Sequence, residues 1–252
     1  NYGWYGPAMN LHRSAFAGRN FEYYSEDSVL SGYLAAAEVN GAATQGVYAY
    51  IKHFALNDQE TNRCSFLLTF ATEQTIRETY LKPFEMAVKN FTGTAQAVMS
   101  SYNFIGTVAS CNNSALLNTV LRDEWGFVGM VITDYNGSYG YQTTDNCIKN
   151  GNDLMLGYGT AESNQLNTES ATTVQAMRQA CKNILYTIAN SGYYVDSTGA
   201  EVSTDGLSKM QVMFYTIDAI VAVIALLAEV LVLVRFFIKR KKAGTKVTVE
   251  KE

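Results

Sequence analysis

The chain is poor in the residues from which small metal and redox sites are built. Its 252 residues include only two histidines, His12 and His53, and four widely separated cysteines. Neither a Cys-x-x-Cys pair nor a His-x-x-x-His pair occurs, so the sequence contains no zinc module and no redox dithiol motif. We therefore expect no metal and no cofactor. We interpret the four cysteines as ordinary buried thiols, at Cys64, Cys111, Cys147 and Cys181.

Proline and charge are also scarce, with two prolines and 17% charged residues against 48% hydrophobic residues. This composition excludes a disordered, collagen-like or disulfide-scaffold chain. The net charge of −4 is uneven, because residues 235–252 carry seven Lys or Arg and two Glu, leaving 12 basic and 21 acidic residues elsewhere. A body this acidic is a poor candidate for phosphate contacts, so we expect no nucleic-acid partner.

One long hydrophobic run lies near the C-terminus. Residues 212–238 are almost wholly apolar and are followed by the basic cluster Lys239–Lys242. About 20 apolar residues suffice to cross a bilayer core, and basic residues beside a span mark its cytoplasmic side. We predict a linker over 191–211, a single-pass transmembrane helix over 212–238 and a basic cytoplasmic tail over 239–252. The rest of the chain would then lie outside the cell membrane. The alternative is a long buried helix of a soluble protein.

Two acidic residues, Asp218 and Glu229, interrupt this apolar run. Eleven positions at 100° per residue return to nearly the same helix face, where Ala222 and Ala225 lie between them. An acidic residue at membrane depth costs a few kcal/mol. This face therefore indicates a helix–helix contact, with a second membrane helix or an upstream segment as the partner.

Residues 1–190 alternate short apolar or β-branched runs with longer helical stretches. Five β-then-α units indicate an α/β fold with a parallel sheet wrapped by helices. We expect strands at residues 8–11, 48–52, 97–101, 129–133 and 153–156, and helices at about 28–45, 72–90, 114–123, 138–149 and 171–190.

Polar residues follow four of the predicted strands. In a closed parallel barrel, the carboxyl ends of the strands form one rim, where active sites lie. The sequence therefore predicts one site built from several strand ends. The residues in question are Arg13 and Arg19 after the first strand, Lys52 and His53 after the second, Ser101, Tyr102 and Asn103 after the third, and Asp134, Tyr135 and Asn136 after the fourth.

Motifs in a fixed order carry a family resemblance across nearly all of residues 1–190. They are Gly18-Arg19-Asn20-Phe21-Glu22, Tyr24-Ser25-Glu26-Asp27, Lys52-His53-Phe54, Asn57-Asp58-Gln59-Glu60-Thr61-Asn62-Arg63, Val98-Met99-Ser100-Ser101-Tyr102-Asn103, Leu121-Arg122-Asp123-Glu124-Trp125-Gly126-Phe127 and Val131-Ile132-Thr133-Asp134-Tyr135, continuing through Gly151-Asn152-Asp153-Leu154 to Asn183-Ile184-Leu185-Tyr186. Together they resemble glycoside hydrolase family 3.

The resemblance implies a retaining β-glycosidase, β-glucosidase-like, acting on oligosaccharides or β-glycosides. In that family Asp134 would match the nucleophile that forms a glycosyl-enzyme intermediate. Arg19, Lys52 and His53 match positions that hydrogen-bond sugar hydroxyls, and Tyr102 matches a residue beside the nucleophile. Residues 1–190 would form about the last five or six units of a (β/α)8 TIM-type barrel, since a whole barrel takes roughly 250 residues.

The same resemblance places the acid/base glutamate in a sandwich domain that follows the barrel. Because a linker, a membrane helix and a tail follow here, we expect that this domain lies upstream, in a permuted arrangement, or does not exist. We also expect the incomplete barrel to leave open sheet edges and an uncovered apolar interior. The fragment alone would then be incompetent in catalysis.

Several alternatives stay open. The chain has Thr133-Asp134-Tyr135 where the family usually has Ser-Asp-Trp, which leaves glucose specificity undecided, whereas the segment after Lys52-His53 lacks the Gly-rich pattern of the N-acetylglucosaminidase branch. Glu60 and Arg63 could form a loop salt bridge or belong to the site. A catalytically silent, membrane-tethered carbohydrate-binding or scaffold protein is the alternative function, and an interaction module is a third.

Overall fold

The computed structural model describes residues 2–136, 139–157, 160, 162–193 and 209–249. The chain divides into two compact units, Asn1–Ala200 and Glu201–Glu252. The first unit holds the sheet and all the predicted site residues. The described part of the second, residues 209–249, is one long helix.

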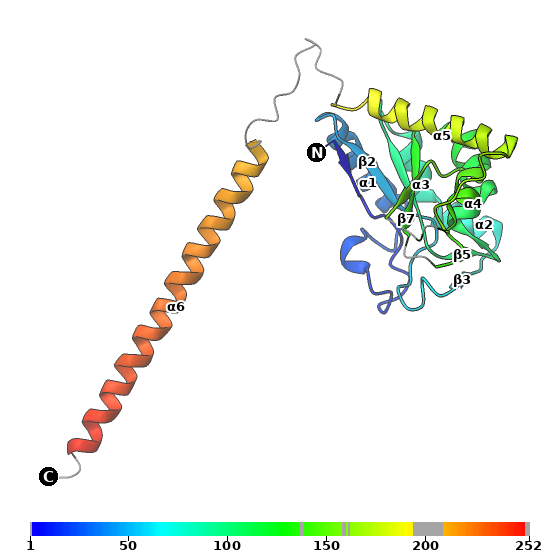
Figure 1. Ribbon diagram of the computed structural model, residues 1–252. Helices are drawn as coiled ribbons and strands as arrows, with labels where there is room; N and C mark the ends of the chain where they lie inside the picture. The colour runs from blue at the N-terminus through cyan, green and yellow to red at the C-terminus, as the bar shows by residue number, and fades with distance from the viewer. Residues whose placement is uncertain (1, 137–138, 158–159, 161, 194–208, 250–252) are drawn as a thin grey trace. The chain divides into compact units, whose positions relative to one another are not determined.

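A five-stranded sheet runs through the first unit in the order β1-β2-β4-β7-β8, and every neighbouring pair is parallel. Its carboxyl ends point to the end of the unit that holds the segment between β1 and α1 (Figure 1). The sheet therefore has the order and direction expected of consecutive barrel strands. The strands are β1 (Gly3–Trp4), β2 (Tyr48–Phe54), β4 (Ala97–Ser100), β7 (Met130–Tyr135) and β8 (Leu154–Leu156).

Helical segments connect successive strands and one follows the last strand. They are η1 (Asn20–Glu22), α1 (Ser28–Ala43), α2 (Glu73–Thr75), η2 (Ile76–Tyr80), α3 (Lys82–Lys89), η3 (Ser110–Asn112), η4 (Ala115–Glu124), α4 (Thr144–Lys149) and α5 (Ala171–Ala189). A second, three-stranded sheet combines β3 (Leu68–Thr69), β5 (Phe104–Ile105) and β6 (Val108–Ala109).

Local chemistry explains where the main helices begin. The Asp27 carboxylate accepts hydrogen bonds from the backbone N–H groups of Val29 and Leu30 at the start of α1. Ser170 accepts from the Thr173 N–H in the same way at the start of α5. These side chains satisfy N–H groups that have no partner within the helix.

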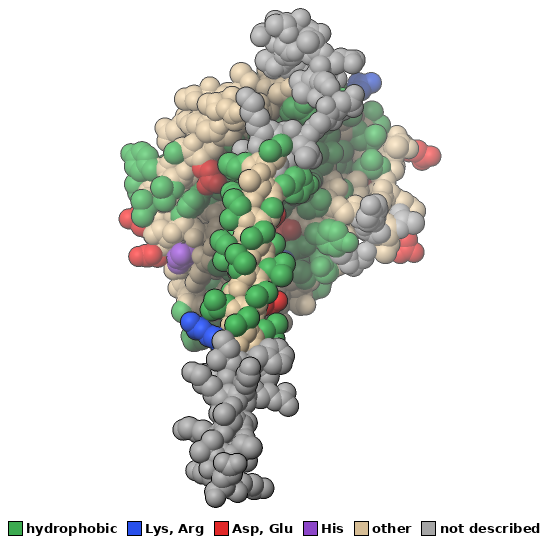
Figure 2. All heavy atoms as spheres, turned by 90° about the vertical axis from the view of Figure 1, so that its left-hand side faces the viewer, with side chains coloured by type: hydrophobic (Ala, Val, Ile, Leu, Met, Phe, Trp, Pro, Cys, Tyr) green, Lys and Arg blue, Asp and Glu red, His purple; other side chains and the backbone are tan. Residues whose placement is uncertain are grey.

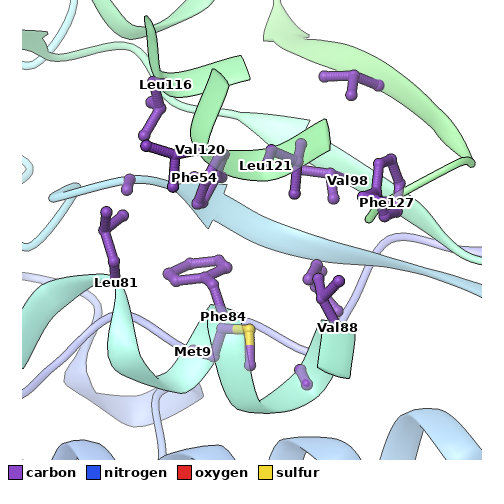
Figure 3. Close-up of a cluster of buried hydrophobic side chains, with 14 of the residues drawn as sticks. Met9, Phe54, Leu81, Phe84, Val88, Val98, Leu116, Val120, Leu121 and Phe127 are labelled. Atoms are coloured by element: carbon purple, nitrogen blue, oxygen red, sulfur yellow. The ribbon is translucent and has the colours of Figure 1, made fainter. Parts of the chain in front are cut away.

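One face of the sheet packs on helices and forms the larger core. Ile51, Val98 and Val131 occupy one register row and are fully buried. Figure 3 shows the contact of this face with α3 and η4. Leu81, Phe84 and Val88, at the start of α3 and within it, recur at helical spacing. The alternation of the strands thus sends every second residue toward this helical layer.

The opposite face is buried as well, which corrects the expectation of an uncovered interior. Tyr50, Ala97 and Met130 share a register row, and Tyr50 and Met130 are only 5% and 1% exposed. Ile184 of α5 packs against them. Tyr48, Leu154 and Leu156 also pack against this cluster, so the expectation of an uncovered interior is wrong for these residues.

Most predicted elements are present, with shifted bounds. The first predicted strand, 8–11, is wrong: only Ala8 forms a bridge, with Lys52. Beyond it the Asn10 side chain both donates to the His53 carbonyl and accepts from the His53 N–H at 2.9 Å. A side-chain amide thus takes the place of the backbone hydrogen bonds that a strand would form here. The first strand of the sheet is instead β1, which pairs with β2.

Two helices also differ from expectation. The helix expected over 138–149 begins only at Thr144, and residue 138 lies outside the described residues. The Tyr141 carbonyl, which a longer helix would use internally, accepts from the Asn112 side chain at 2.6 Å. The region predicted as one helix over 72–90 is divided into α2, η2 and α3.

The cysteines are all free thiols, but not all are buried. Cys111 and Cys147 are fully buried, Cys64 is half-buried and Cys181 is exposed on α5. The interpretation as buried thiols is therefore correct for the first pair and wrong for Cys181.

The second unit is α6 (Lys209–Val249), a helix of 41 residues. Its segment Val212–Arg235, 24 residues, is long and apolar enough to cross a membrane. Figure 2 shows hydrophobic side chains along the described part of this helix. The predicted linker, 191–211, falls largely on residues 194–208, outside the described residues, as do the side chains of the tail 239–252.

Candidate active site

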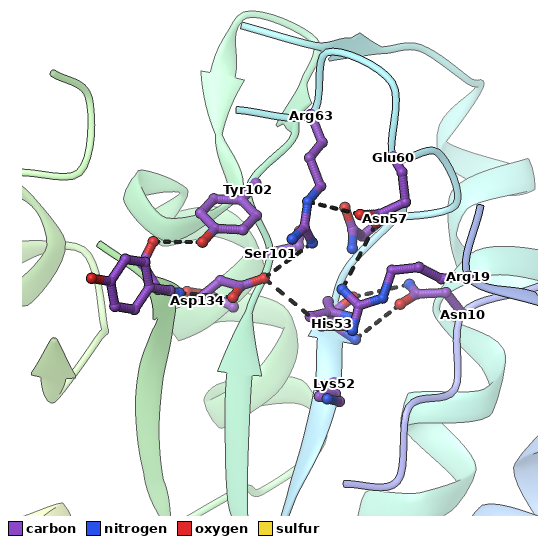
Figure 4. Close-up of polar contacts among 12 residues, drawn as sticks. Asn10, Arg19, Lys52, His53, Asn57, Glu60, Arg63, Ser101, Tyr102 and Asp134 are labelled. Atoms are coloured by element: carbon purple, nitrogen blue, oxygen red, sulfur yellow. Dashed lines mark hydrogen bonds and ion pairs between the residues drawn. The ribbon is translucent and has the colours of Figure 1, made fainter. Parts of the chain in front are cut away.

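Asp134 lies at the carboxyl end of β7, next to last in the strand, and is 7% exposed. Its Oδ1 accepts the backbone N–H of Tyr135 at 2.7 Å. Its Oδ2 has no hydrogen-bond partner among the described residues and lies 3.8 Å from both His53 Nε2 and Arg63 Nη1. One oxygen is thus anchored by the backbone and the other faces the site (Figure 4).

His53 comes from β2, two strands away from β7 in the sheet. It is 1% exposed, and the Asn10 amide fixes its backbone on both sides. Burial, together with the nearby cations Arg19, Lys52 and Arg63, holds the pKa of His53 well below its usual range. The contact with Asp134 therefore joins a neutral imidazole to the carboxylate and is not an ion pair.

Arg19 and Lys52 meet at a shared carboxylate. Glu22 pairs with the Arg19 Nε and lies 3.6 Å from Lys52 Nζ. Arg19 also lies 3.7 Å from Glu60. These pairs hold both cations beside His53 on one side of Asp134 (Figure 4).

Arg63 crosses the mouth of the site from the loop after β2. Its Nε lies 3.0 Å from Glu60 Oε2, and its guanidinium carbon lies 4.6 Å from the centre of the Tyr102 ring. Tyr102 in turn donates to the Tyr135 carbonyl at 2.6 Å. Glu60 and Arg63 thus form the loop salt bridge, and Arg63 also lies 3.8 Å from Asp134.

Burial raises the pKa of Asp134 above its usual value. The Tyr135 N–H and the cations Arg63, Arg19 and Lys52 act in the opposite sense and favour the charged form. The charge of the Asp134 carboxylate therefore depends on the surrounding cations. Buried carboxylates with such charged neighbours are candidates for a functional site.

Several buried polar atoms around Asp134 have no hydrogen-bond partner among the described residues. They include His53 Nδ1, Arg63 Nη1 and both amide atoms of Asn57, and Asn57 is 0% exposed. Buried polar groups are normally paired, and each unpaired group costs roughly 1–3 kcal/mol. A ligand with several hydroxyl groups would supply the missing partners.

The structure brings together all the site residues predicted from sequence: Arg19, Lys52, His53, Tyr102 and Asp134. Asn10 and Asn57 were missed, and Arg63 was left undecided. Asn57 and Arg63 stood in a motif already quoted, but nothing in their spacing shows that this loop folds back over β7. No group of three or more His, Cys, Asp or Glu side chains placed to hold a metal occurs within the described part of the chain.

The profile of the glycosyl hydrolase family 3 N terminal domain matches residues 3–181. The chain belongs to glycoside hydrolase family 3. The family match covers the whole of the sheet described above and every residue of the candidate site.

Curated relatives in this family are β-glucosidases. Beta-glucosidase A of Butyrivibrio fibrisolvens is 44% identical over 163 residues, covering 64% of this chain and 19% of the relative. A β-glucosidase of Ruminococcus albus is 45% identical over 130 residues, covering 52% and 13%. The chain thus spans less than one fifth of the length of these two curated relatives.

Solved family 3 structures share the fold. Beta-glucosidase 3B of Thermotoga neapolitana, in complex with glucose, matches this chain with a TM-score of 0.64 and 39% identity. The match covers 75% of this chain and 27% of the Thermotoga chain. The Bifidobacterium adolescentis family 3 β-glucosidase has a TM-score of 0.70 and 28% identity, covering 82% and 29%. The five-stranded sheet is accordingly part of a TIM-type barrel, as predicted.

Proposed function

We propose that this chain carries the nucleophile half of a retaining β-glucosidase site, with Asp134 as the nucleophile. The observation that carries the proposal is the Asp134 carboxylate, held by one oxygen and open at the other. An in-line attack on an anomeric carbon needs such a fixed, unpaired oxygen. The β-glucosidase relatives support the same reaction.

The neighbouring side chains would bind the sugar. Neutral His53 can donate or accept a hydrogen bond, and Arg19, Lys52 and Arg63 supply further donors. Asn57 adds a donor and an acceptor with no partner among the described residues. As the glycosyl-enzyme bond forms, the negative charge on Asp134 is lost, so the cations act mainly on the ground-state pKa and on the hydroxyls.

The proton for the leaving oxygen would come from outside these 252 residues. Glu22 and Glu60 are the described carboxylates that contact the site cations, and each is engaged by two of those cations. Both carboxylates are held beside these cations, and Glu60 Oε1, 3.7 Å from Arg19, has no hydrogen-bond partner among the described residues. We propose that the acid/base belongs to a further segment, which agrees with the much greater length of the relatives.

A mechanism-based label tests the nucleophile without the acid/base. In 2,4-dinitrophenyl 2-deoxy-2-fluoro-β-glucoside the leaving group needs no proton, and the fluorine slows release of the sugar. We expect intact-mass spectrometry to show one fluoroglucosyl adduct on the 252-residue chain, and peptide mapping to place it on Asp134. Absence of the adduct, or an adduct elsewhere, would contradict the proposal and favour a catalytically silent carbohydrate-binding protein.

We further propose that α6 anchors the chain as a single-pass membrane protein with the barrel unit outside the cytoplasm. The support is the apolar segment Val212–Arg235 and the basic residues that follow it in the sequence. External protease added to intact cells should remove the barrel unit and spare a tag placed after Glu252. Protection of the barrel unit would reverse the orientation.

A further inference from the structure

Cys111 and Cys147 are two buried thiols that the proposed reaction does not use. Cys111 lies in η3 and Cys147 in α4, and both side chains are fully buried. They belong to the same cluster of buried side chains, although they are far apart in the sequence. The fold therefore brings one pair of cysteines together in the interior of the first unit.

One residue, Asn152, binds the backbone of both cysteines. Its backbone N–H donates to the Cys147 carbonyl at 3.1 Å, and its side-chain amide donates to the Cys111 carbonyl at 2.5 Å. Asn112, the residue after Cys111, accepts a hydrogen bond from the Cys147 thiol at 3.3 Å through its Oδ1. The two cysteines are therefore held close to each other by bonds to both of their segments.

The two thiol groups also contact each other. A side-chain hydrogen bond joins Cys147 to Cys111, and this bond, together with burial, raises the pKa of the Cys147 thiol well above its usual value. Because the thiolate is the form that attacks a disulfide, the enclosed Cys147 thiol reacts slowly with external oxidants. A bond between the two sulfurs would therefore form while the chain folds, before both groups are enclosed.

The proposed orientation of α6 places this pair in a compartment where disulfides persist. Domains outside the cytoplasm meet oxidising conditions, whereas thiols in the cytosol are kept reduced. A disulfide also requires two cysteines whose side chains already lie next to each other, because widely separated ones cannot be joined without moving the backbone. The contacts with Asn152 and Asn112 favour this requirement for Cys111 and Cys147.

We propose that Cys111 and Cys147 form a disulfide bond that ties η3 to α4, the helix after the nucleophile strand β7. The oxidant is a low-molecular-weight disulfide such as oxidised glutathione. One cysteine attacks it, forms a mixed disulfide and releases one glutathione thiol; the second cysteine then attacks the mixed disulfide and releases the other. The two cysteines lose two protons and two electrons, which the oxidant takes up. The proposal rests on the orientation of α6 for the compartment, and on the structure for the pairing.

Refolding in a glutathione buffer tests the pairing. The 252-residue chain in detergent micelles would be reduced and unfolded, refolded with reduced and oxidised glutathione, and alkylated with N-ethylmaleimide in denaturant. We expect two alkylated cysteines instead of four, and peptide mapping should show Cys111 joined to Cys147, with Cys64 and Cys181 alkylated. The linked chain should melt about 5–10 °C above the same chain after reduction, because the bond restricts the unfolded chain.

Matched variants separate this bond from other effects of removing a buried thiol. Cys147→Ala should show no linked peptide and no difference in melting temperature between its oxidised and reduced forms. The double variant Cys64→Ala, Cys181→Ala is the control, and it should keep both the link and the difference.

Three results would each overturn the proposal: alkylation of all four cysteines, a link that includes Cys64 or Cys181, or a linked chain no more stable than the reduced one. Failure of the proposed orientation is recognised separately, by protection of the barrel unit from external protease. The refolding experiment has a single compartment and depends only on the pair itself.

Discussion

Two buried carboxylates, Asp134 in β7 and Asp153 just before the neighbouring strand β8, have different sets of partners. Asp153 stands just before β8 and is 9% exposed; its oxygens accept from Arg122 at 2.8 Å, the Val131 N–H at 2.7 Å and Asn183 at 2.8 Å. Asp134 is 7% exposed, yet its Oδ2 has the neutral His53 ring and the Arg63 guanidinium at 3.8 Å and no hydrogen bond among the described residues. The first carboxylate is saturated by the fold and the second is left open.

The difference shows that burial alone does not identify a reactive carboxylate. Burial raises the pKa of both groups, that of Asp153 to about 6. What separates them is the partners. Asp153 joins η4, β7 and α5 through bonds to its own side chain, so its role is structural. Asp134 keeps an oxygen without a hydrogen bond among the described residues, facing His53 and Arg63, two side chains that can bind a ligand.

The largest expected effect is on labelling at Asp134. Asp134→Asn should slow reaction with the fluoroglucoside by about 10⁴-fold or more, because the nucleophilic oxygen is lost. The same change removes a buried charge, so the free energy of unfolding should rise by roughly 1 kcal/mol. Labelling rates and urea unfolding measure the two effects. Asp123→Asn, on an exposed residue, is the control, and equal loss in both variants would contradict the assignment.

The next effect is on stability at Asp153. Asp153→Ala leaves Arg122 buried without its carboxylate, and breaking such a pair costs about 3–5 kcal/mol. Urea unfolding should show this loss in the midpoint at an unchanged slope. Glu124→Ala breaks the exposed pair with Arg77 and should change the midpoint little. If the two variants were equally stable, the buried network would not be the element that holds β7, β8 and α5 together.

A smaller effect concerns the pH dependence of the site. Labelling requires ionised Asp134 and is lost as the pH falls through its pKa, which burial raises, so the acid limb should lie above the ordinary aspartate value of about 3.9. Arg63 lowers this pKa. Arg63→Gln should therefore move the acid limb to higher pH, whereas Arg77→Gln, a remote surface change, should not. A shift to lower pH would contradict the electrostatic role of Arg63.

The smallest expected effect is at an exposed carboxylate. Asp27 caps α1 through two backbone N–H groups, so Asp27→Ala should lower the free energy of unfolding by about 1 kcal/mol. Thermal or urea unfolding detects a change of this size. The labelling rate of Asp134 should stay at the wild-type value, and a large loss of labelling would show that α1 positions the site.

Sequence by itself determined the parallel sheet, most of its strands and the residues at their carboxyl ends. Strand periodicity is a local property of the sequence, and parallel strands bring their carboxyl ends to one edge of the sheet. The sequence alone therefore predicts that His53 and Asp134 lie close together. The long apolar segment of α6 is likewise a local property. Asp27 and Ser170 mark their helix starts through bonds to neighbours within three residues.

Only the tertiary structure decided the rest, because it depends on contacts between segments far apart in the chain. The Asn10 amide replaces a predicted strand by binding the His53 backbone 43 residues away. Ile184 of α5 packs against a sheet face that was expected to be open. Arg63 and Phe66 lie on a loop that packs against Tyr102 and Tyr141. The position of such a loop depends on these distant contacts, and no periodicity in the sequence predicts it.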